Sequence, residues 1–247
     1  MNDLDKSYTD RRLASVYDSL NPWAADSDFY FDLAGSEPKR ILDVGCGTGL
    51  LTVALAEHGH TVTGADPSDG MLRIARNRPG GDKVTWVQCR ADELDLTDRF
   101  DLIIMTGHAF QVFLDDSAVQ AALAAFHEHL VPGGIAAFET RNPALESWRH
   151  WSPEESEKTV DVPGIGPVRV YTSLVDGSRN KVTYRTHFHF PDGTDHIGEG
   201  TLRLLEVDEL KEHVTKAGFS IAALYGDWDK RPIGEAEKEI IALVVRD

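Results

Sequence analysis

The chain has 247 residues, with 25 Lys and Arg against 41 Asp and Glu, so its formal net charge is −16 at pH 7. This acidic balance offers no basic surface for a phosphate backbone and argues against DNA, RNA and anionic membranes as partners. The length fits one sizeable domain, or one domain with an insertion, and is sufficient for a substantial hydrophobic core.

The first segment, residues 1–37, is predicted to be a helical cap rich in aromatic residues. It opens with acidic residues and has no hydrophobic stretch behind them, so we expect neither a secretion signal nor a membrane span. The two cysteines, Cys46 and Cys89, fall in a glycine-rich turn and a strand-like run. This placement argues against a structural disulfide and fits a cytoplasmic protein.

From residue 39 to residue 142 the pattern alternates between strand and helix, which predicts a parallel sheet covered on both faces. The expected strands are 40–44, 61–65, 84–88, 100–106 and 134–140, and the expected helices are 50–58, 69–77 and 116–130.

After this unit the alternation of strand and helix stops. Three strand-like runs, 168–175, 181–190 and 198–205, are separated by turn signals and predict an antiparallel meander. A helix at 208–217 and two strand candidates at 220–228 and 240–245 then predict a closing hairpin. We therefore divide the chain into a core, 38–142 with 204–247, and an inserted β lid, 143–203.

The segment from Asp43 to Gly49, Asp-Val-Gly-Cys-Gly-Thr-Gly, links the first strand to the first helix. Glycines at alternate positions permit positive φ angles and leave room for a ligand against bare backbone. Asp66 ends the next strand, 21 positions after Gly45, where a carboxylate can accept hydrogen bonds from both hydroxyls of a ribose. The pattern predicts a site for a cofactor that contains adenosine.

The glycine spacing bears on which cofactor binds. The dinucleotide fingerprint G-x-G-x-x-G needs glycine where this chain has Leu50. The block from Asp43 to Gly49, followed by Leu-Leu-Thr, instead resembles motif I of the class I S-adenosylmethionine-dependent methyltransferases. The resemblance implies S-adenosyl-L-methionine as cofactor and S-adenosyl-L-homocysteine as product.

Three further blocks support the resemblance: Arg90-Ala91-Asp92, the run 100–107 and the run 130–134. They are similar to the adenine-contacting motif, the fourth strand and the turn into the fifth strand of this family. The resemblance implies an α/β fold with a Rossmann-like, doubly wound seven-stranded sheet of order 3-2-1-4-5-7-6, in which strand seven is antiparallel. It is closest to small-molecule methyltransferases with a lid inserted after strand five, and it does not identify the acceptor.

The resemblance also implies roles for single residues. Asp43, Gly45 and Gly47 would hold the methionine end of the cofactor, Asp66 the ribose and Asp92 the adenine. Tyr17 resembles N-terminal tyrosines that close over the cofactor, although ordinary helix packing explains it equally well. The implied cofactor-binding residues are Tyr17, Asp43, Gly45, Gly47, Asp66, Pro67, Met71, Ala91, Asp92, Thr106 and Gly107.

Two side chains are candidates for catalysis. His108 follows the fourth strand, at the edge where open α/β sheets bind ligands, and is either a general base, a partner that orients the acceptor, or a residue that only shapes the pocket. Arg141, at the end of the fifth strand, either grips an acceptor carboxylate or pairs with Glu139, and the ion pair is slightly favoured. Asn142 is also expected to face the cleft.

The sequence predicts no metal site. His187 and His189 share one face of a strand and His196 is near in sequence, but no cysteine or acidic spacing completes a ligand set. Lid aromatics such as Trp148, Trp151, Tyr171 and Tyr184 either wall an acceptor pocket or pack the lid on the core.

We thus expect methyl transfer to a nitrogen or oxygen of a small-molecule acceptor by a monomer or homodimer. Three alternatives stay open at this point: a non-catalytic or regulatory adenosylmethionine-binding protein, an enzyme that modifies the cofactor itself, and an NAD-dependent oxidoreductase.

Overall fold

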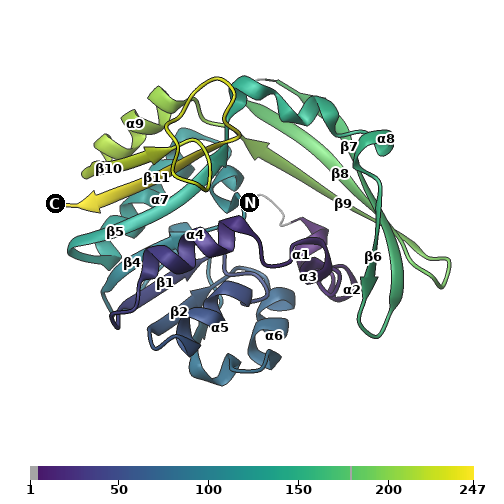
Figure 1. The fold of residues 1–247 in the computed structure, drawn as a ribbon, viewed down its shortest axis with the longest axis horizontal. Helices are drawn as coiled ribbons and strands as arrows, with labels where there is room; N and C mark the ends of the chain where they lie inside the picture. The colour runs from purple at the N-terminus through teal and green to yellow at the C-terminus, as the bar shows by residue number, and fades with distance from the viewer. Residues whose placement is uncertain (1–4, 179) are drawn as a thin grey trace.

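The computed structural model describes residues 5–178 and 180–247. A seven-stranded sheet forms the core, and a separate four-stranded sheet extends from it (Figure 1). Within the described residues, no helix combines the length and the apolar character needed to cross a membrane.

The core sheet has the order β10-β11-β5-β4-β1-β2-β3. Strands β1 to β5 are parallel, and β11 runs antiparallel to both β5 and β10. This is the predicted order 3-2-1-4-5-7-6, with β11 as the antiparallel strand, so the predicted fold class is confirmed. The bounds are β1 Arg40–Val44, β2 Thr61–Ala65, β3 Thr85–Val87, β4 Phe100–Met105, β5 Leu130–Arg141, β10 Phe219–Tyr225 and β11 Glu239–Arg246.

Both faces of the sheet are covered because its central strands are apolar on both sides. Leu42 and Ile103 pack against helices α7 (Asp116–His129) and α9 (Val207–Lys216). Ile41 and Ile104 pack on the other face, against α4 (Ala25–Ala34) and α5 (Leu50–Glu57). The other helical segments of the core are α6 Asp69–Asn77, η1 Gly81–Lys83, η2 Ala91–Glu93 and η3 Ala109–Val112.

The lid is a meander of order β6-β7-β8-β9. The expectation of three strands was wrong by one, because β6 (Lys158–Val162) is a largely exposed edge strand without a clear apolar alternation. The other strands are β7 Gly166–Gly177, β8 Lys181–His189 and β9 Asp195–Arg203, and the segments η4 Pro143–Leu145, η5 Ser147–His150 and α8 Pro153–Ser156 connect the lid to β5.

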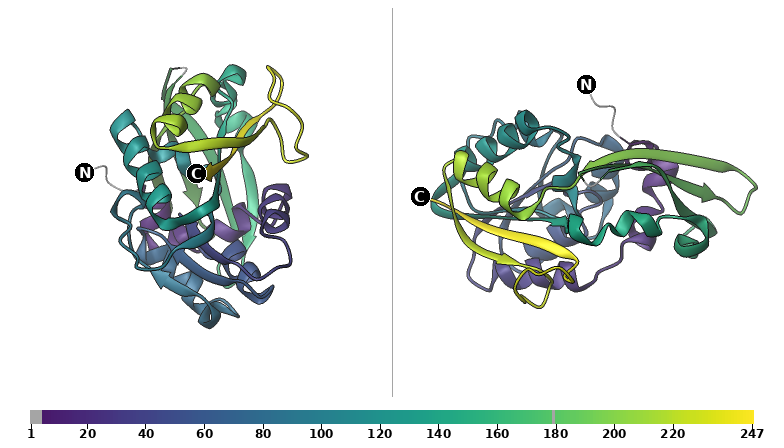
Figure 2. Two further views of the ribbon diagram at one scale, coloured as in Figure 1. Left: turned by 90° about the vertical axis from the view of Figure 1, so that its left-hand side faces the viewer. Right: turned by 90° about the horizontal axis from the view of Figure 1, so that it is seen from above.

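The N-terminal helices α1 (Lys6–Thr9), α2 (Arg11–Ala14) and α3 (Tyr17–Leu20) lie between the core and the lid (Figures 1 and 2). Leu13 and Val16 share a buried apolar cluster with the lid, including Phe188. On the core side, the Ser68 hydroxyl donates to the backbone carbonyl of Tyr8 at 2.6 Å. The N-terminal segment therefore joins lid and core, a contact that the sequence analysis did not foresee.

Candidate active site

The glycine-rich loop has the expected backbone. Gly45, Gly47 and Gly49 have φ angles of +74°, +54° and +75°. A Cβ on Gly49 would lie 2.6 Å from the Trp86 ring, so packing already requires glycine there. A Cβ on Gly47 would meet nothing closer than Tyr17, at 3.9 Å. The loop thus leaves space at Gly47, where a ligand can approach the backbone.

Asp66 fixes this loop to the end of β2. One carboxylate oxygen accepts the Gly47 N–H at 2.9 Å, and the other accepts the Ser68 N–H at 2.8 Å. Burial raises the pKa of Asp66. Each oxygen keeps a second lone pair, so the same carboxylate can still accept from ribose hydroxyls.

Asp43 is buried at the end of β1, and its Oδ2 accepts from the Thr52 hydroxyl at 2.6 Å. Its Oδ1 is buried and has no hydrogen-bond partner within the described residues. Burial raises the pKa of Asp43 to about 7. A buried carboxylate oxygen without a partner beside a ligand loop fits a site for a positively charged group, such as the ammonium of a methionine moiety.

Tyr17 lies across this loop from α3. Its ring is 3.9 Å from the Cβ position of Gly47, and its hydroxyl is 3.7 Å from that of Gly107. Tyr17 therefore spans the ends of β1 and β4, as a residue that covers a ligand would.

The other residues predicted to bind the cofactor have protein contacts of their own. Asp92, in η2, pairs with Arg90 at 3.1 Å, and the Pro67 carbonyl accepts from the Gln88 side chain at 3.2 Å. Met71 and Ala91 are buried. Cofactor roles for Pro67, Met71, Ala91, Asp92, Thr106 and Gly107 stay predictions.

His108 follows β4 in the left-handed region, with φ at +59°. Its backbone N–H donates to Glu139 Oε1 at 2.6 Å, and its Nε2 lies 2.8 Å from Glu239 Oε2. Glu139 is completely buried and also accepts the Tyr30 hydroxyl. Burial raises the pKa of Glu139. One carboxylate thus holds the backbone of His108 and another orients its imidazole.

The sequence analysis missed Glu239. It begins β11 and is followed by six residues of which five are β-branched or aliphatic, so the only available signal was an acidic residue opening a buried strand. Its partnership with His108 joins residues 131 positions apart and has no local pattern.

Arg141 does not pair with Glu139, so the favoured interpretation of this residue was wrong. Both oxygens of Glu139 are already engaged by His108 and Tyr30. Instead, the backbone N–H and the Nη1 of Arg141 both donate to Gln111 Oε1, each at 3.1 Å. Burial lowers the pKa of Arg141, opposed chiefly by the charge of Glu239.

Asn142 does not serve the cleft either. Its side-chain amide donates to the carbonyls of Gly234 and Glu237 at 3.0 and 2.9 Å, which ties the end of β5 to the loop before β11.

Aromatic residues of the N-terminal segment and the lid complete the wall near Arg141. The side chains of Tyr8 and Tyr184 are neighbours, and both interact electrostatically with the charge of Arg141. Trp151 packs edge-to-face on Tyr184 at 5.3 Å, and its ring lies 5.7 Å from the Arg141 guanidinium carbon. Trp148 instead packs within the lid core.

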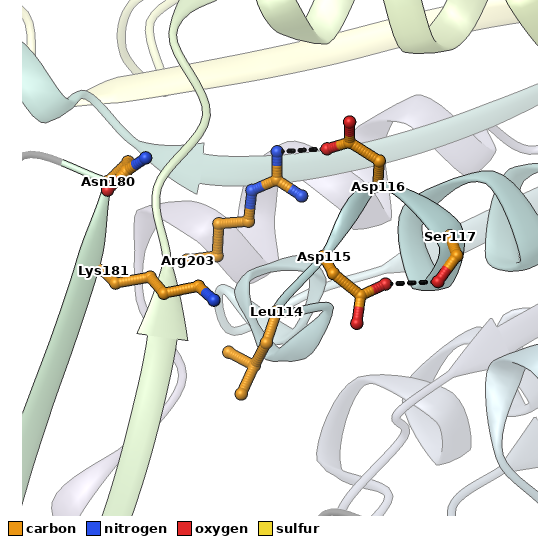
Figure 3. A pocket seen from close by; sticks show the side chains of 7 residues that line it. All are labelled: Leu114, Asp115, Asp116, Ser117, Asn180, Lys181 and Arg203. Atoms are coloured by element: carbon orange, nitrogen blue, oxygen red, sulfur yellow. Dashed lines mark hydrogen bonds and ion pairs between the residues drawn. The ribbon is translucent and has the colours of Figure 1, made fainter.

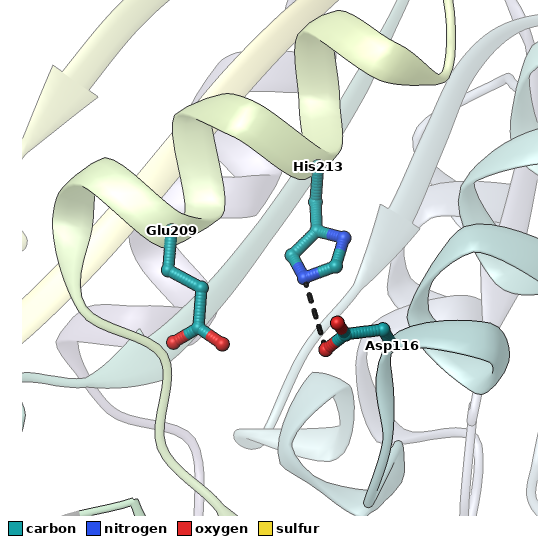
Figure 4. A group of neighbouring side chains, drawn as sticks. All are labelled: Asp116, Glu209 and His213. Atoms are coloured by element: carbon teal, nitrogen blue, oxygen red, sulfur yellow. Dashed lines mark ion pairs between the residues drawn. The ribbon is translucent and has the colours of Figure 1, made fainter.

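An open depression of about 450 Å³ lies elsewhere, where the lid meets the start of α7 (Figure 3). Next to it, ligand atoms of Asp116, Glu209 and His213 lie within 4.8 Å of one another (Figure 4). Arg203 donates to both Asp116, at 2.6 Å, and Glu209. The guanidinium already occupies the position that a cation would take between these carboxylates.

Comparisons with known proteins agree with this arrangement. The family described as a methyltransferase domain matches residues 41–134. A protein of Geobacillus sp. (strain WCH70) named as a methyltransferase is 28% identical over 208 residues, which cover 81% of this chain and 82% of that protein. The ubiquinone biosynthesis O-methyltransferase of Coxiella burnetii (strain Dugway 5J108-111) is 29% identical over 187 residues, covering 74% and 72%.

Solved structures show the same fold. An S-adenosylmethionine-dependent methyltransferase from Clostridium acetobutylicum ATCC 824 superposes with a TM-score of 0.79 at 20% identity, covering 95% of this chain and 97% of that one. CalS10 from Micromonospora echinaspora, an amino pentose methyltransferase with bound S-adenosylmethionine, gives a TM-score of 0.68 at 22% identity, covering 94% and 95%.

The fold and the glycine-loop site together define a class I methyltransferase. Residues 41–134 match the methyltransferase domain family, and the fold, the glycine loop and its two carboxylates are those of an enzyme that uses S-adenosyl-L-methionine. The nicotinamide alternative is thereby set aside.

Proposed function

We propose that this methyltransferase transfers a methyl group to a nitrogen or oxygen of a small molecule held between the carboxyl edge of the core sheet, the N-terminal segment and the lid. The observation that carries the proposal is the pair of His108 and Glu239 at the end of β4, next to the glycine loop. The names of similar proteins support both acceptor atoms, since one is an O-methyltransferase and another acts on an amino pentose.

Residues of this chain would hold the cofactor by its charged and hydroxylated parts. The free Oδ1 of Asp43 would bind the methionine ammonium, Asp66 the ribose hydroxyls, and the backbone at Gly47 would lie against the ligand. When bound, the cofactor supplies an electrophilic methyl on a sulfonium. The protein must then place the acceptor in line with it, which can lower a barrier by about 7–11 kcal/mol.

Glu239 determines which nitrogen of His108 is basic. An ionised carboxylate only accepts hydrogen bonds, so the short contact requires His108 Nε2 to carry the proton. Nδ1 is then the nitrogen with a free lone pair, and it would take the proton that an amine or hydroxyl acceptor loses. Glu139 supports this arrangement because it holds the strained backbone of His108 through its N–H.

The test is release of S-adenosyl-L-homocysteine with pools of amines and alcohols as acceptors. His108→Ala should lower turnover by about 10²–10⁴-fold, the usual contribution of a positioned base, while calorimetry shows unchanged cofactor affinity. His150→Ala is the matched control, since that histidine is exposed and pairs only with Glu155.

His108→Gln separates two roles, because glutamine can hydrogen-bond but cannot take up a proton. If this variant kept full turnover at every pH, His108 would orient the acceptor without acting as a base. If no acceptor pool released product from the wild-type protein while the cofactor bound tightly, the non-catalytic alternative would be favoured.

A further inference from the structure

We infer that the acceptor carries a carboxylate and that Arg141 binds it. This inference rests on the proposed function and names the acceptor class for the same site. It begins from an unusual arginine: Arg141 is only partly exposed, yet no carboxylate of the described residues lies within ion-pair distance of its side chain. A guanidinium has five N–H donors, and the structure gives its side chain one hydrogen-bond partner, the Gln111 amide oxygen.

Gln111 provides a second and independent observation. It is 1% exposed, and its Oε1 accepts both the backbone N–H and the Nη1 of Arg141. Its Nε2 is buried and has no partner within the described part of the chain. A buried amide nitrogen without a partner lowers the stability of the folded state. Stability therefore does not explain why Gln111 holds Arg141 in this position.

The surroundings of Arg141 suit an occupant with a planar anionic group. Tyr8 and Tyr184 are near enough to interact with the charge of Arg141, and the Trp151 ring lies 5.7 Å from its guanidinium carbon. Three separate parts of the chain, α1, β8 and the segment before α8, converge there. Arginine binds carboxylates through two parallel N–H bonds, which fixes both position and orientation.

Acidic groups also face this region and must be weighed. Glu239 and Glu139 compensate the charge of Arg141 at longer range, but their oxygens bind His108 and Tyr30. Asp5, the N-cap residue of α1, interacts electrostatically with both tyrosines. None of these carboxylates forms an ion pair with Arg141, so its donors stay available to a ligand.

The register of the sheet limits the size of the acceptor. Glu239 of β11 lies directly opposite Arg141 of β5, and Glu239 holds His108. Side chains of directly opposed residues start about 5 Å apart. Because Arg141 and the carboxylate that holds His108 start from paired positions of the sheet, we take the acceptor to be a small amino acid or hydroxy acid.

The test uses pairs of probes with the same shape and different charge. Acetate, propionate and benzoate, each against its primary amide, are titrated by calorimetry into the protein saturated with S-adenosyl-L-homocysteine. We expect the carboxylates to bind and the amides to bind at least tenfold more weakly. Arg141→Lys keeps the positive charge but loses the two parallel N–H donors of the guanidinium, so it should weaken carboxylate binding about 10- to 100-fold. Arg169→Lys is the control, because Arg169 lies on the lid and pairs with Glu157.

A second variant guards against simple misfolding of the first. Gln111→Glu would give Arg141 a carboxylate of its own, so carboxylate probes should lose their binding while cofactor affinity stays unchanged. Equal binding of amides and carboxylates, or unchanged carboxylate binding in Arg141→Lys, would overturn the inference.

The two proposals can fail separately. In one outcome, acceptors without a carboxylate are methylated and Arg141→Lys leaves the rate unchanged. This would refute the inference that the acceptor carries a carboxylate and leave the proposed function standing. Binding of carboxylates through Arg141 without methyl transfer to any amino acid or hydroxy acid would leave the inferred site standing and refute the proposed function.

Discussion

The two halves of the active site are built in different ways. The cofactor half, residues 43–68, uses backbone groups of one glycine loop and two carboxylates, all from neighbouring strands. The acceptor half that we propose consists of side chains from six different elements or turns: Tyr8, His108, Gln111, Arg141, Tyr184 and Glu239. The first half is continuous in sequence, whereas the second exists only when the sheet, the lid and the N-terminal segment are assembled.

The difference matters for specificity. Backbone N–H groups and positive-φ glycines make a shape that suits one cofactor and tolerates little change. Side chains from separate elements can be replaced one at a time, so the acceptor can change while the loop stays the same. Both halves share one physical feature: within the described residues, buried Asp43 in the first and partly exposed Arg141 in the second have no ion-pair partner.

The largest effect should come from the cofactor half. Asp66→Ala is expected to weaken adenosylmethionine binding by about 2–4 kcal/mol, because hydrogen bonds from two ribose hydroxyls to a charged acceptor are lost and water replaces them in part. The loop also loses its bond from the Gly47 N–H. Calorimetry measures the change, and Asp92→Ala, at a more exposed carboxylate paired with Arg90, should have a smaller effect. Equal effects of the two substitutions would show that the ribose site is elsewhere.

Asp43 predicts a dependence of stability on pH. Its pKa is about 7 in the folded protein against 3.8 without the fold, so the folded state binds the proton more tightly. Stability is therefore lost as pH rises from about 4 to about 7, and the loss is complete above that window. Asp43→Asn, which can keep the bond with Thr52, should make the protein more stable by about 1–3 kcal/mol at pH 8, while cofactor affinity falls.

Urea unfolding of both proteins without cofactor at pH 4 and pH 8 checks this expectation. The variant should gain its advantage only at the higher pH. An advantage of the same size at pH 4 would mean that the ionisation of Asp43 is not its origin.

The backbone of the proposed cofactor half could be predicted well from the sequence because the information for it is local. The strand Arg40–Val44, the alternate glycines and Asp66 stand within 27 residues, and each carries a backbone requirement that limits the residue type. The order of the sheet followed from the family resemblance and is confirmed.

The acceptor half could be predicted only in part. His108 and Arg141 were proposed because His108 follows a core strand and Arg141 ends one. Glu239 and Gln111 were not proposed. The role of Glu239 depends on the register of the sheet, and that of Gln111 depends on the geometry of a turn, which no sequence pattern encodes. The ion pair expected between Arg141 and Glu139 was wrong. Glu139 accepts from the Tyr30 hydroxyl of α4, a contact that the closeness of Arg141 and Glu139 in sequence could not reveal.

Glu239→Gln probes how much the acceptor half depends on one distant contact. The amide keeps the shape but can no longer fix the proton on His108 Nε2 by charge, so turnover should fall by about tenfold, or 1.4 kcal/mol. Cofactor affinity should be unchanged, which distinguishes this variant from Asp66→Ala. NMR of the His108 ring nitrogens, measured without any acceptor, should show a changed distribution of the proton between Nδ1 and Nε2, and an unchanged distribution would remove Glu239 as the positioning residue of His108.

The smallest effect concerns the contact by which the N-terminal segment reaches the cofactor half. Asp18 accepts from the Thr48 hydroxyl and from Arg78, both at 2.5 Å, so it ties α3 and Tyr17 to the glycine loop. Because the pair is partly exposed, Asp18→Asn should weaken cofactor binding by only about 0.5–1 kcal/mol, and less in high salt. Asp69→Asn removes a surface pair within α6 and should leave binding unchanged. If Asp18→Asn also left binding unchanged at low salt, the cofactor half would be independent of the N-terminal segment, and only the acceptor half would depend on assembly.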